Sequence, residues 1–483
     1  MRNALREVAR APTRGAYRRL AAVALSLATL LLGTVALRGG STPPRANGTH
    51  SRAAAVLNGG VNVGEQDPVA LARAMRETGL DTLQISYDAR LTTWDGADLD
   101  FREREPGVLR ARVRAARAAG LSVMLVLRVR LDGEHPSNRH LWHGLAWPRD
   151  AALEAFFARY RDFVLWAADL AEEEDVAMLV IGNELNALTS TGVDVPGVLR
   201  RALDHEQLAR EAAALRRCDA EGPVRWHDGG SYPNLVSAVA GEQRALARWG
   251  ASVAGPHEGR ASRLRQRRRL HDEFWRATLD EARAHYRGVL SYGAGFDSFS
   301  EVGFWDATDA LVTTAYFGLY ELGEDADRRA FEAAWTRHLE SVSRVARARP
   351  SHPELPVYFG ELGFTRRKHS GVRPWSYEGF EILPRADGSH ACVSWGDVPL
   401  DLGERARALD ALGDALARGA LPQLRGFSLW KITTDDTHAA VEPYAIRLHD
   451  ALTTETRRAR SERPTLAAVA RLSALLRARP AAR

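Results

Sequence analysis

The sequence of 483 residues predicts a (β/α)₈ barrel, and three observations support this fold class. Eight apolar, strand-like segments occur between residues 56 and 430, and amphipathic, helix-like segments follow most of them. The third segment, residues 121–129, is continuously apolar, which is typical of a parallel strand buried on both faces. Two of the segments stop at a glutamate, Glu184 and Glu361. In this barrel the carboxyl ends of all strands face one cavity, so both carboxylates are expected there.

Each expected strand is a short apolar run bounded by polar or turn-forming residues. The expected strands are residues 56–63, 82–87, 121–129, 176–182, 289–292, 311–316, 357–360 and 424–430.

The expected helices show apolar residues at helical spacing, and glycines end several of them. Gly79 and Gly120 follow the first two, and the third carries aromatic residues such as Phe156 and Phe163 that predict a core-facing stripe. The expected helices are residues 68–78, 108–119, 150–172, 327–348, 402–417 and 465–476.

Two long segments interrupt the alternation of strands and helices. Residues 189–270 follow the fourth strand and are interpreted as an insertion. Residues 361–400 follow the seventh strand and are interpreted as a long loop. Because both segments begin at the carboxyl end of a strand, they are expected on the same side of the barrel as the glutamates. Long segments of this kind in compact domains are usually functional or disordered.

The N-terminus has the layout of an export signal. Six arginines precede an uncharged, mostly apolar run, Leu20 to Leu37, whose length approaches the roughly 20 residues that span a bilayer. Arg38 interrupts any small-residue cleavage site, so we favour a retained anchor over a cleaved peptide. Residues 1–38 are thus a signal peptide or signal anchor, 39–54 a flexible tether, and 55–483 the catalytic barrel. We expect an exported protein, periplasmic or extracellular, held at the membrane by this segment alone.

Composition disfavours nucleic-acid binding and redox chemistry. The formal charge is 66 − 61 = +5, which is small for this length, and the arginines of residues 263–269 fit a charged helix face. Cys218 and Cys392 lie in no metal or redox motif. An exported protein could pair them, but we expect two unpaired thiols.

Glu184 and Glu361 suit the cleavage of a glycosidic bond. Retaining glycosidases place two carboxyl groups about 5–5.5 Å apart, where one protonates the leaving oxygen and the other attacks the anomeric carbon. We expect the Asn183 side chain to bind the sugar 2-hydroxyl, whose hydrogen bond strengthens in the transition state. A different interpretation is that Asn183 and Glu184 cap a helix N-terminus.

An ordered set of segments resembles glycoside hydrolase family 113, the endo-β-mannanases of the clan A barrels. The likeness covers most of residues 56–432 apart from the insertion. It includes Glu361-Leu362-Gly363-Phe364 and Gly426-Phe427-Ser428-Leu429-Trp430-Lys431. The segments that carry it are residues 121–131, 150–185, 286–292, 304–316, 361–375 and 426–431.

The resemblance implies roles for individual residues. Glu184 would be the acid/base and Glu361 the nucleophile. Tyr316 would hydrogen-bond the nucleophile, and Trp430 would stack beneath the sugar in the −1 subsite. The remaining expected substrate-binding residues are Asn183, Arg128, Trp375 and Lys431.

Three positions depart from the family pattern. Asn183 matches the wider clan rather than family 113, Arg128 stands where a histidine is expected, and Phe296 stands where a tryptophan is expected. These departures concern the wall that binds sugar. They bear on mannan specificity rather than on the reaction.

The sequence therefore predicts a retaining glycoside hydrolase acting on β-linked glycans, with β-1,4-mannan as one candidate. It is expected to act as a monomer without a cofactor. One alternative is the same barrel hydrolysing another β-glycan or a cell-envelope polysaccharide. A second is a non-catalytic carbohydrate-binding barrel, which would not need both glutamates.

A third alternative is a metal-dependent hydrolase. His135, His140 and His143 occur close together in the sequence and could suggest zinc. Because Trp142 and Trp147 lie in the same segment, a loop that contacts sugar is the favoured interpretation, and no metal is expected.

Overall fold

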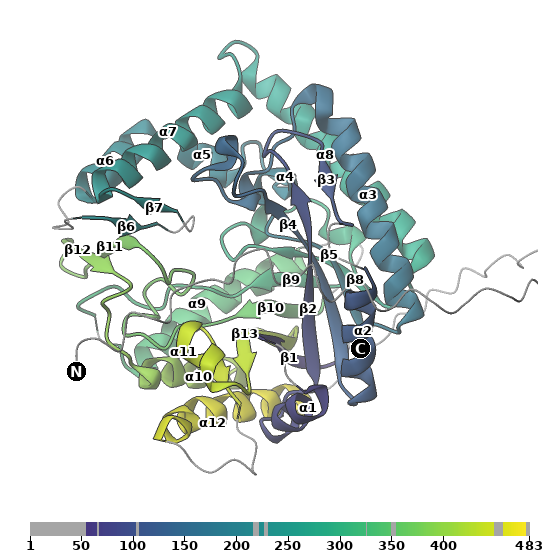
Figure 1. The fold of residues 1–483 in the computed structure, drawn as a ribbon, viewed down its shortest axis with the longest axis vertical. Coiled ribbons are helices and arrows are strands. Elements are labelled where there is room, and N and C mark those ends of the chain that lie inside the picture. Colours follow the sequence, from purple (N-terminus) through teal and green to yellow (C-terminus); the bar gives the residue numbers. More distant parts are fainter. Residues whose placement is uncertain are drawn as a thin grey trace, which may run out of the picture. The chain divides into compact units, whose positions relative to one another are not determined.

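In the described part of the chain, eight parallel strands form a closed barrel (Figure 1). Each strand pairs with the next one along the wall, and β1 pairs with both β2 and β13, which closes the ring. The fold-class prediction is confirmed. The strands are β1 (Leu57–Asn62), β2 (Thr82–Leu91), β4 (Ser122–Leu131), β5 (Met178–Asn183), β8 (Val289–Ala294), β9 (Leu311–Thr314), β10 (Val357–Leu362) and β13 (Leu424–Thr433).

The computed structural model describes residues 55–64, 67–102, 106–215, 222–226, 230–324, 326–348, 354–448 and 457–479. The apolar segment at residues 20–37 and the tether lie outside them. Within the described residues, no helix combines the length and apolarity that a membrane crossing requires.

Helices cover the outside of the barrel wall, as Figure 1 shows for α3 and α8. Their starts follow local chemistry: Asp67 caps the first helix ahead of Pro68, and the Asp327 carboxylate accepts the backbone N–H of Ala330. The covering helices are α1 (Pro68–Glu77), α2 (Pro106–Ala118), α3 (Asp150–Glu173), α8 (Arg260–His285), α9 (Arg328–Arg347), α10 (Leu402–Ala417) and α12 (Arg457–Ala478).

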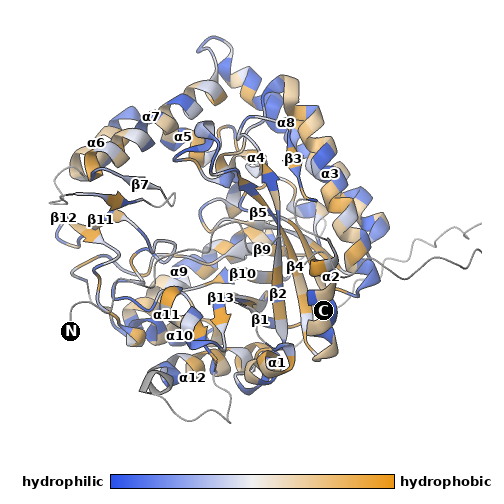
Figure 2. Ribbon diagram, in the orientation of Figure 1, coloured by the Kyte–Doolittle hydropathy of each residue, from blue (hydrophilic) through white to orange (hydrophobic). Residues whose placement is uncertain are grey.

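Alternation along the strands separates two apolar layers. Met124 and Val126 of β4 lie in a small cluster with Met178, Val180 and Tyr358, which fills the barrel interior. The residues between them face the larger core beneath the helices. Figure 2 shows the apolar colouring of the strands beside the mixed colouring of the surrounding helices. One step beyond Val126 on the interior face stands Arg128, where the polar mouth of the barrel begins.

The insertion after β5 is mostly helical and ends earlier than expected. Helix α8 begins at Arg260 and packs against α3, so residues 260–270 belong to the barrel wall. The buried face of α8 includes the polar residues Arg267 and His271. The apolar periodicity that would indicate a helix in the sequence is therefore interrupted. The insertion holds α4 (Asn186–Thr189), α5 (Gly197–Leu203), α6 (His205–Leu215), β6 (Val224–Arg225), β7 (Ser231–Tyr232) and α7 (Leu235–Ala254).

The segment after β10, expected as a loop, contains an antiparallel hairpin of β11 (Phe380–Pro384) and β12 (His390–Ser394). Phe380 and Ile382 pack against a cluster of the insertion that includes Trp226 and Tyr232. Figure 1 shows β6 and β7 beside this hairpin. Two insertions far apart in sequence therefore pack on each other on the active-site side. Smaller elements are β3 (Leu99–Asp100), β14 (Ile446–Arg447) and α11 (Asp436–Val441).

Cys392 on β12 is disulfide-bonded, so the expectation of an unpaired thiol is wrong for this residue. Cys218 lies outside the described residues. A count of cysteines could not settle pairing, because pairing depends on the distance between segments that only the fold determines.

Candidate active site

Glu361 reaches the mouth through an irregularity in β10. Tyr358 faces the barrel interior and Phe359 faces the helices, so strict alternation would aim Glu361 outward. The register between β10 and β9 shifts between Phe359 and Glu361. Such irregularities commonly re-aim a side chain beside an active site. The Glu361 side chain is thereby buried at the mouth, 6% exposed.

Glu184 follows β5 directly and has a left-handed backbone, with a φ of 51°. This conformation costs a residue other than glycine on the order of 1–3 kcal/mol and persists only where the surroundings enforce it. Here the Glu184 N–H donates to the carbonyl of Gly293 at 2.8 Å. The next N–H, of Leu185, donates to the Tyr292 hydroxyl at 2.8 Å. The backbone is thus fixed on both sides of the carboxylate.

Both carboxylate oxygens of Glu361 accept hydrogen bonds. The Tyr316 hydroxyl donates to Oε2 at 2.8 Å, which is the contact that the resemblance implies. The Asn183 amide donates to Oε1 at 3.1 Å. Two donors on one carboxylate favour its ionised form. Asn183 does not cap a helix, since α4 has Leu185 at its N-cap and no side-chain capping bond.

Sequence reasoning missed Thr314, which contacts the other carboxyl group. Its hydroxyl donates to Oε1 of Glu184 at 2.9 Å. Thr314 ends β9 and stands in register with Glu361 of β10. The only signal for it was its position inside the expected strand 311–316, two residues before Tyr316.

The two glutamates have unequal electrostatic surroundings. Burial and, after it, the negative charge of Glu361 together raise the pKa of Glu184 to about 8, against the opposing effect of the Thr314 hydrogen bond. Burial also raises the pKa of Glu361, but Arg128, Tyr316, Asn183 and Lys431 all act to lower it. We therefore place the proton of this pair on Glu184 and the negative charge on Glu361.

The raised pKa of Glu184 predicts the alkaline limit of activity. A general acid works only while protonated, so kcat/KM should fall as pH rises through about 8. Since the charge of Glu361 contributes to this shift, Glu361→Gln should lower the pKa of Glu184. Infrared titration of the carboxyl band, with Glu184→Gln to assign it, measures that change. A fall in kcat/KM at a pH near the ordinary glutamate pKa would contradict the assignment of the catalytic proton to Glu184.

The same pKa shift has a consequence for stability. Between the ordinary glutamate pKa and about 8, the folded protein holds a proton on Glu184 that the unfolded chain has released. The free energy of unfolding should therefore decrease as pH rises through that window, because the stabilising contribution of protonated Glu184 is lost. Glu184→Gln removes the ionisable group, so its urea-unfolding free energy should depend less on pH than that of the native protein.

Trp430 and two cations form one wall of the site. The Arg128 guanidinium carbon lies 5.5 Å from the centre of the Trp430 ring, and the Lys431 ammonium lies 4.9 Å from it. Glu442 accepts a hydrogen bond from Lys431 at 2.5 Å, and Asp88 lies 3.4 Å from Nε of Arg128. The cations are held over the ring rather than extended into solvent. The peptide bond between Trp430 and Lys431 is cis.

Trp375 continues the aromatic surface away from Glu361. Its side chain is 39% exposed and stacks on Phe296, with ring centroids 4.9 Å apart. Phe296 in turn meets the Tyr316 ring edge-on at 6.4 Å. Phe296, which departs from the family pattern, therefore supports the exposed tryptophan. The structure brings all eight expected site residues to this side of the barrel.

The three histidines of the β4–α3 segment do not converge. His135 contacts Ser137 at 2.8 Å, and His140 stacks on Tyr232 of the insertion. Burial, together with the charge of Arg128, lowers the pKa of His143 to about 3. Among the described residues, no group of three or more metal-ligating side chains is arranged to hold an ion. The metal-dependent alternative has no ligand set in this part of the chain.

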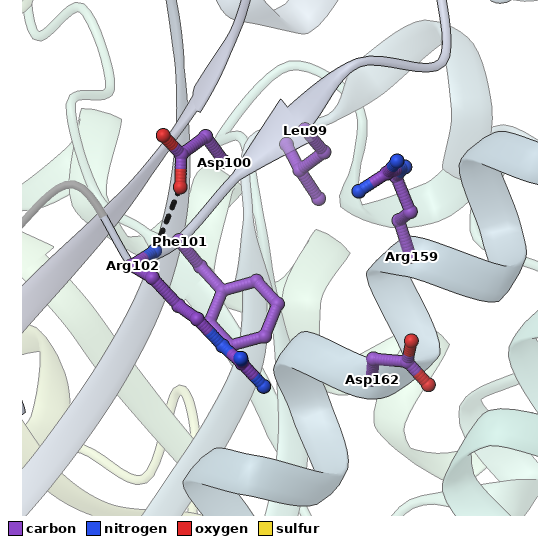
Figure 3. A pocket seen from close by; sticks show the side chains of 6 residues that line it. All are labelled: Leu99, Asp100, Phe101, Arg102, Arg159 and Asp162. Atoms are coloured by element: carbon purple, nitrogen blue, oxygen red, sulfur yellow. Dashed lines mark hydrogen bonds between the residues drawn. The ribbon is translucent and has the colours of Figure 1, made fainter.

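Two hollows differ in their relation to the glutamates. A cavity of about 440 Å³ opens beside the mouth, with Arg128 in its wall. A separate hollow of about 300 Å³ lies outside the barrel between β3 and α3. Figure 3 shows Arg159 and Asp162 of α3 on one side of it and the Phe101 ring on the other, with the Asp100 carboxylate turned away from α3. None of the site residues named above lines this second hollow.

Comparison with known families finds one match, over part of the chain. Residues 264–387 match Glycoside Hydrolase Family 113, a span that includes Tyr316, Glu361 and Trp375. The chain is family 113-like. No curated protein matches it.

Solved structures similar to this family 113-like chain share its fold. One is a family 113 β-mannanase from Alicyclobacillus acidocaldarius, with a TM-score of 0.51 and 18% identity over 87% of this chain and 98% of that one. Another is a family 113 β-1,4-mannanase in a complex, with a TM-score of 0.51 and 16% identity over 86% of this chain and 99% of that one. At this identity the likeness establishes the barrel alone.

Proposed function

We propose that this chain is a retaining glycoside hydrolase that cleaves β-linked glycans. The observation that carries the proposal is the asymmetry of two carboxyl groups in one barrel mouth. Glu361 is buried with a donor on each oxygen, whereas Glu184 has one neutral donor and a pKa raised to about 8. A double-displacement mechanism requires one ionised and one protonated carboxyl group.

The proposed reaction has two steps. Ionised Glu361 attacks the anomeric carbon while Glu184 transfers its proton to the leaving glycosidic oxygen, which gives a covalent glycosyl-enzyme and a free alcohol. Glu184, now ionised, then removes a proton from water, whose oxygen displaces Glu361 from the anomeric carbon. Tyr316 and Asn183 hold the Glu361 carboxylate in place through their hydrogen bonds. The carboxyl separation is expected at about 5–6 Å.

The substrate is proposed to be a β-1,4-linked glycan, with mannan as the first candidate. The family match and the two mannanase structures above support this choice. Trp430 would carry the sugar at the cleaved bond and Trp375 a sugar further along. Another β-glycan remains the second candidate, because Arg128 and Phe296 depart from the family pattern in this wall. A purely binding barrel would not need the unequal pKa values of the two glutamates.

Digestion of a polysaccharide panel tests the proposal. β-Mannan, β-glucan, β-galactan and cell-envelope glycans would be incubated with the protein, with products sized and their first-formed anomer determined by NMR. We expect hydrolysis of at least one β-linked glycan with retained β configuration, and none by Glu361→Gln. Initial formation of the α anomer would exclude the retaining mechanism. Inactivity towards every β-glycan would count against the proposed substrate class.

We also propose that the protein is exported and stays anchored through residues 20–37. The arginine-rich leader and the apolar run support this, as does the disulfide bond at Cys392, since disulfides persist in oxidising compartments. Cell fractionation of the full chain and of a chain lacking residues 1–38 tests it. Recovery of the full chain in the cytoplasm would overturn the proposal.

A further inference from the structure

The cavity beside the catalytic mouth is built from three parts of the chain. The carboxyl end of β4 supplies residues 128–131, and the segment that follows it supplies Gly133 and residues 138–143. The third part is the β6–β7 region of the insertion, through Gly230 and Tyr232. The cavity measures about 440 Å³, which is in the usual range for a small-molecule site.

The lining is basic. Arg128, Arg130 and Arg139 all contribute to the wall, and no aspartate or glutamate does. Asp88 lies 3.4 Å from Nε of Arg128, and Asp132 accepts a hydrogen bond from Arg90 at 3.2 Å, but neither carboxylate lines the cavity itself. Three guanidinium groups around a hollow of this size favour an anionic occupant, because planar N–H pairs match carboxylate and sulfate oxygens.

A buried ring nitrogen in the same wall has no protein partner. Among the described residues, Nε2 of His143 is shielded from solvent and makes no hydrogen bond. Buried polar atoms are normally satisfied, so an unsatisfied one in a cavity wall indicates a site that a ligand atom completes. Burial, together with the charge of Arg128, keeps the imidazole neutral, so one ring nitrogen carries a proton and the other can accept a hydrogen bond.

The same cavity offers aromatic surface for a sugar ring. Trp142 is 40% exposed, and its ring packs edge-on against His143. The Arg139 guanidinium carbon lies 5.4 Å from the centre of the Tyr232 ring. Gly144 is required for this arrangement, because a Cβ there would lie 2.1 Å from the Trp142 ring. An exposed aromatic ring beside guanidinium groups suits a charged sugar better than a bare ion.

Arg128 joins this cavity to the catalytic centre. Its guanidinium lines the cavity, lies over Trp430, and lowers the pKa of both glutamates by its charge. A glycan held by Trp430 at the cleaved bond therefore has its neighbouring residue within reach of the basic cavity.

We propose that this cavity is a subsite for an anionic sugar, so that the preferred substrate is a β-linked glycan carrying carboxylate, sulfate or phosphate groups beside the cleaved bond. The inference rests on the proposed glycosidase function and specifies its substrate class. Arg130 and Arg139 would bind the anion, Nε2 of His143 would hydrogen-bond to the bound sugar, and Trp142 would pack against the sugar ring.

Binding of matched oligosaccharides tests the subsite. The probes are a β-1,4-mannan hexasaccharide, the same chain oxidised at C6 to uronate, and the same chain with sulfate or phosphate at O6. Calorimetry on the full-length Glu361→Gln protein gives their affinities without turnover. At least one anionic form should bind about tenfold more tightly than the neutral form, and added salt should reduce the difference. The anionic form that binds most tightly identifies the anion that the cavity recognises.

Substitutions in the cavity wall test whether the preference for anionic oligosaccharides comes from this cavity. Arg130→Gln with Arg139→Gln should abolish the anionic preference, Arg139→Lys should retain most of it, and Arg159→Gln, a surface control on α3, should leave it unchanged. If the protein with the native cavity bound the neutral oligosaccharide as tightly as the anionic forms, or more tightly, the subsite proposal would be wrong. It would also be wrong if the preference for an anionic form persisted in the variant with both Arg130→Gln and Arg139→Gln. Hydrolysis of neutral mannan without any anionic preference would refute the subsite alone. Failure to hydrolyse any β-glycan, neutral or anionic, would refute the proposed function.

Discussion

Glu361→Ala is expected to abolish hydrolysis by the retaining route, for a natural glycan and for an activated aryl glycoside alike. A better leaving group cannot help, because the bond that fails to form is the one between the carboxylate and the anomeric carbon. The loss in kcat should be on the order of 10⁶-fold, the size observed when a catalytic nucleophile is removed. Tyr316 and Asn183 remain, but neither offers an ionised oxygen in its place, because burial holds the pKa of the Tyr316 hydroxyl well above its ordinary value and an amide does not ionise.

The measurement is steady-state hydrolysis with azide as an external nucleophile. In Glu361→Ala, azide should enter from the face that the carboxylate vacated and give a glycosyl azide of inverted configuration. Glu154→Ala, which removes an exposed glutamate from α3, is the matched control and should behave as the native protein. Hydrolysis by Glu361→Ala with retention at the native rate would place the nucleophile elsewhere in the chain.

The sequence predicted the barrel and the two glutamates because both depend on local pattern. Continuous apolar runs such as residues 121–129 mark strands buried on both faces, and β4 was found there. A strand that stops at a glutamate marks a carboxyl end at the mouth, and both carboxylates lie there. Neither inference required knowledge of which distant segments come together.

What the sequence could not predict depends on register and long-range packing. Alternation alone would aim Glu361 towards the helices, and only the register shift beside Phe359 explains its position. Thr314 is one hydroxyl among many in the sequence, and its contact with Glu184 follows from the pairing of β9 with β10. Residues 260–270 of helix α8 were assigned to the insertion, because the buried face of this helix includes Arg267, whose guanidinium lies 5.0 Å from the Trp147 ring centre.

Arg128 shows how a departure from a family pattern can be informative. Arginine at this position, where a histidine is expected, adds a second permanent positive charge beside Trp430 to that of Lys431. That charge favours ionised Glu361 and also forms one side of the basic cavity. Arg128 therefore acts in both the catalytic site and the basic cavity. The family pattern predicts the reaction, but it does not predict the preference for an anionic substrate.

Glu184→Ala is expected to separate the two steps of the reaction. Loss of the general acid should slow cleavage of a natural glycan by about 10²–10⁴-fold, because its alkoxide leaving group needs a proton. An aryl glycoside with an acidic leaving group should still form the glycosyl-enzyme, since Glu361 and its donors are untouched. The second step should then be slow, because no base activates water.

Stopped-flow measurement of aryl alcohol release tests this expectation. Glu184→Ala should give a burst followed by a slow phase, and azide should restore turnover and yield a glycosyl azide of retained β configuration. The matched control is Asp297→Asn, since Asp297 is the other nearby carboxylate whose charge affects the pKa of Glu184. If Asp297→Asn loses activity on the natural glycan and Glu184→Ala does not, then Asp297 is the acid. If Glu184→Ala alone fails and azide restores it, the proton comes from the carboxyl group at the end of β5.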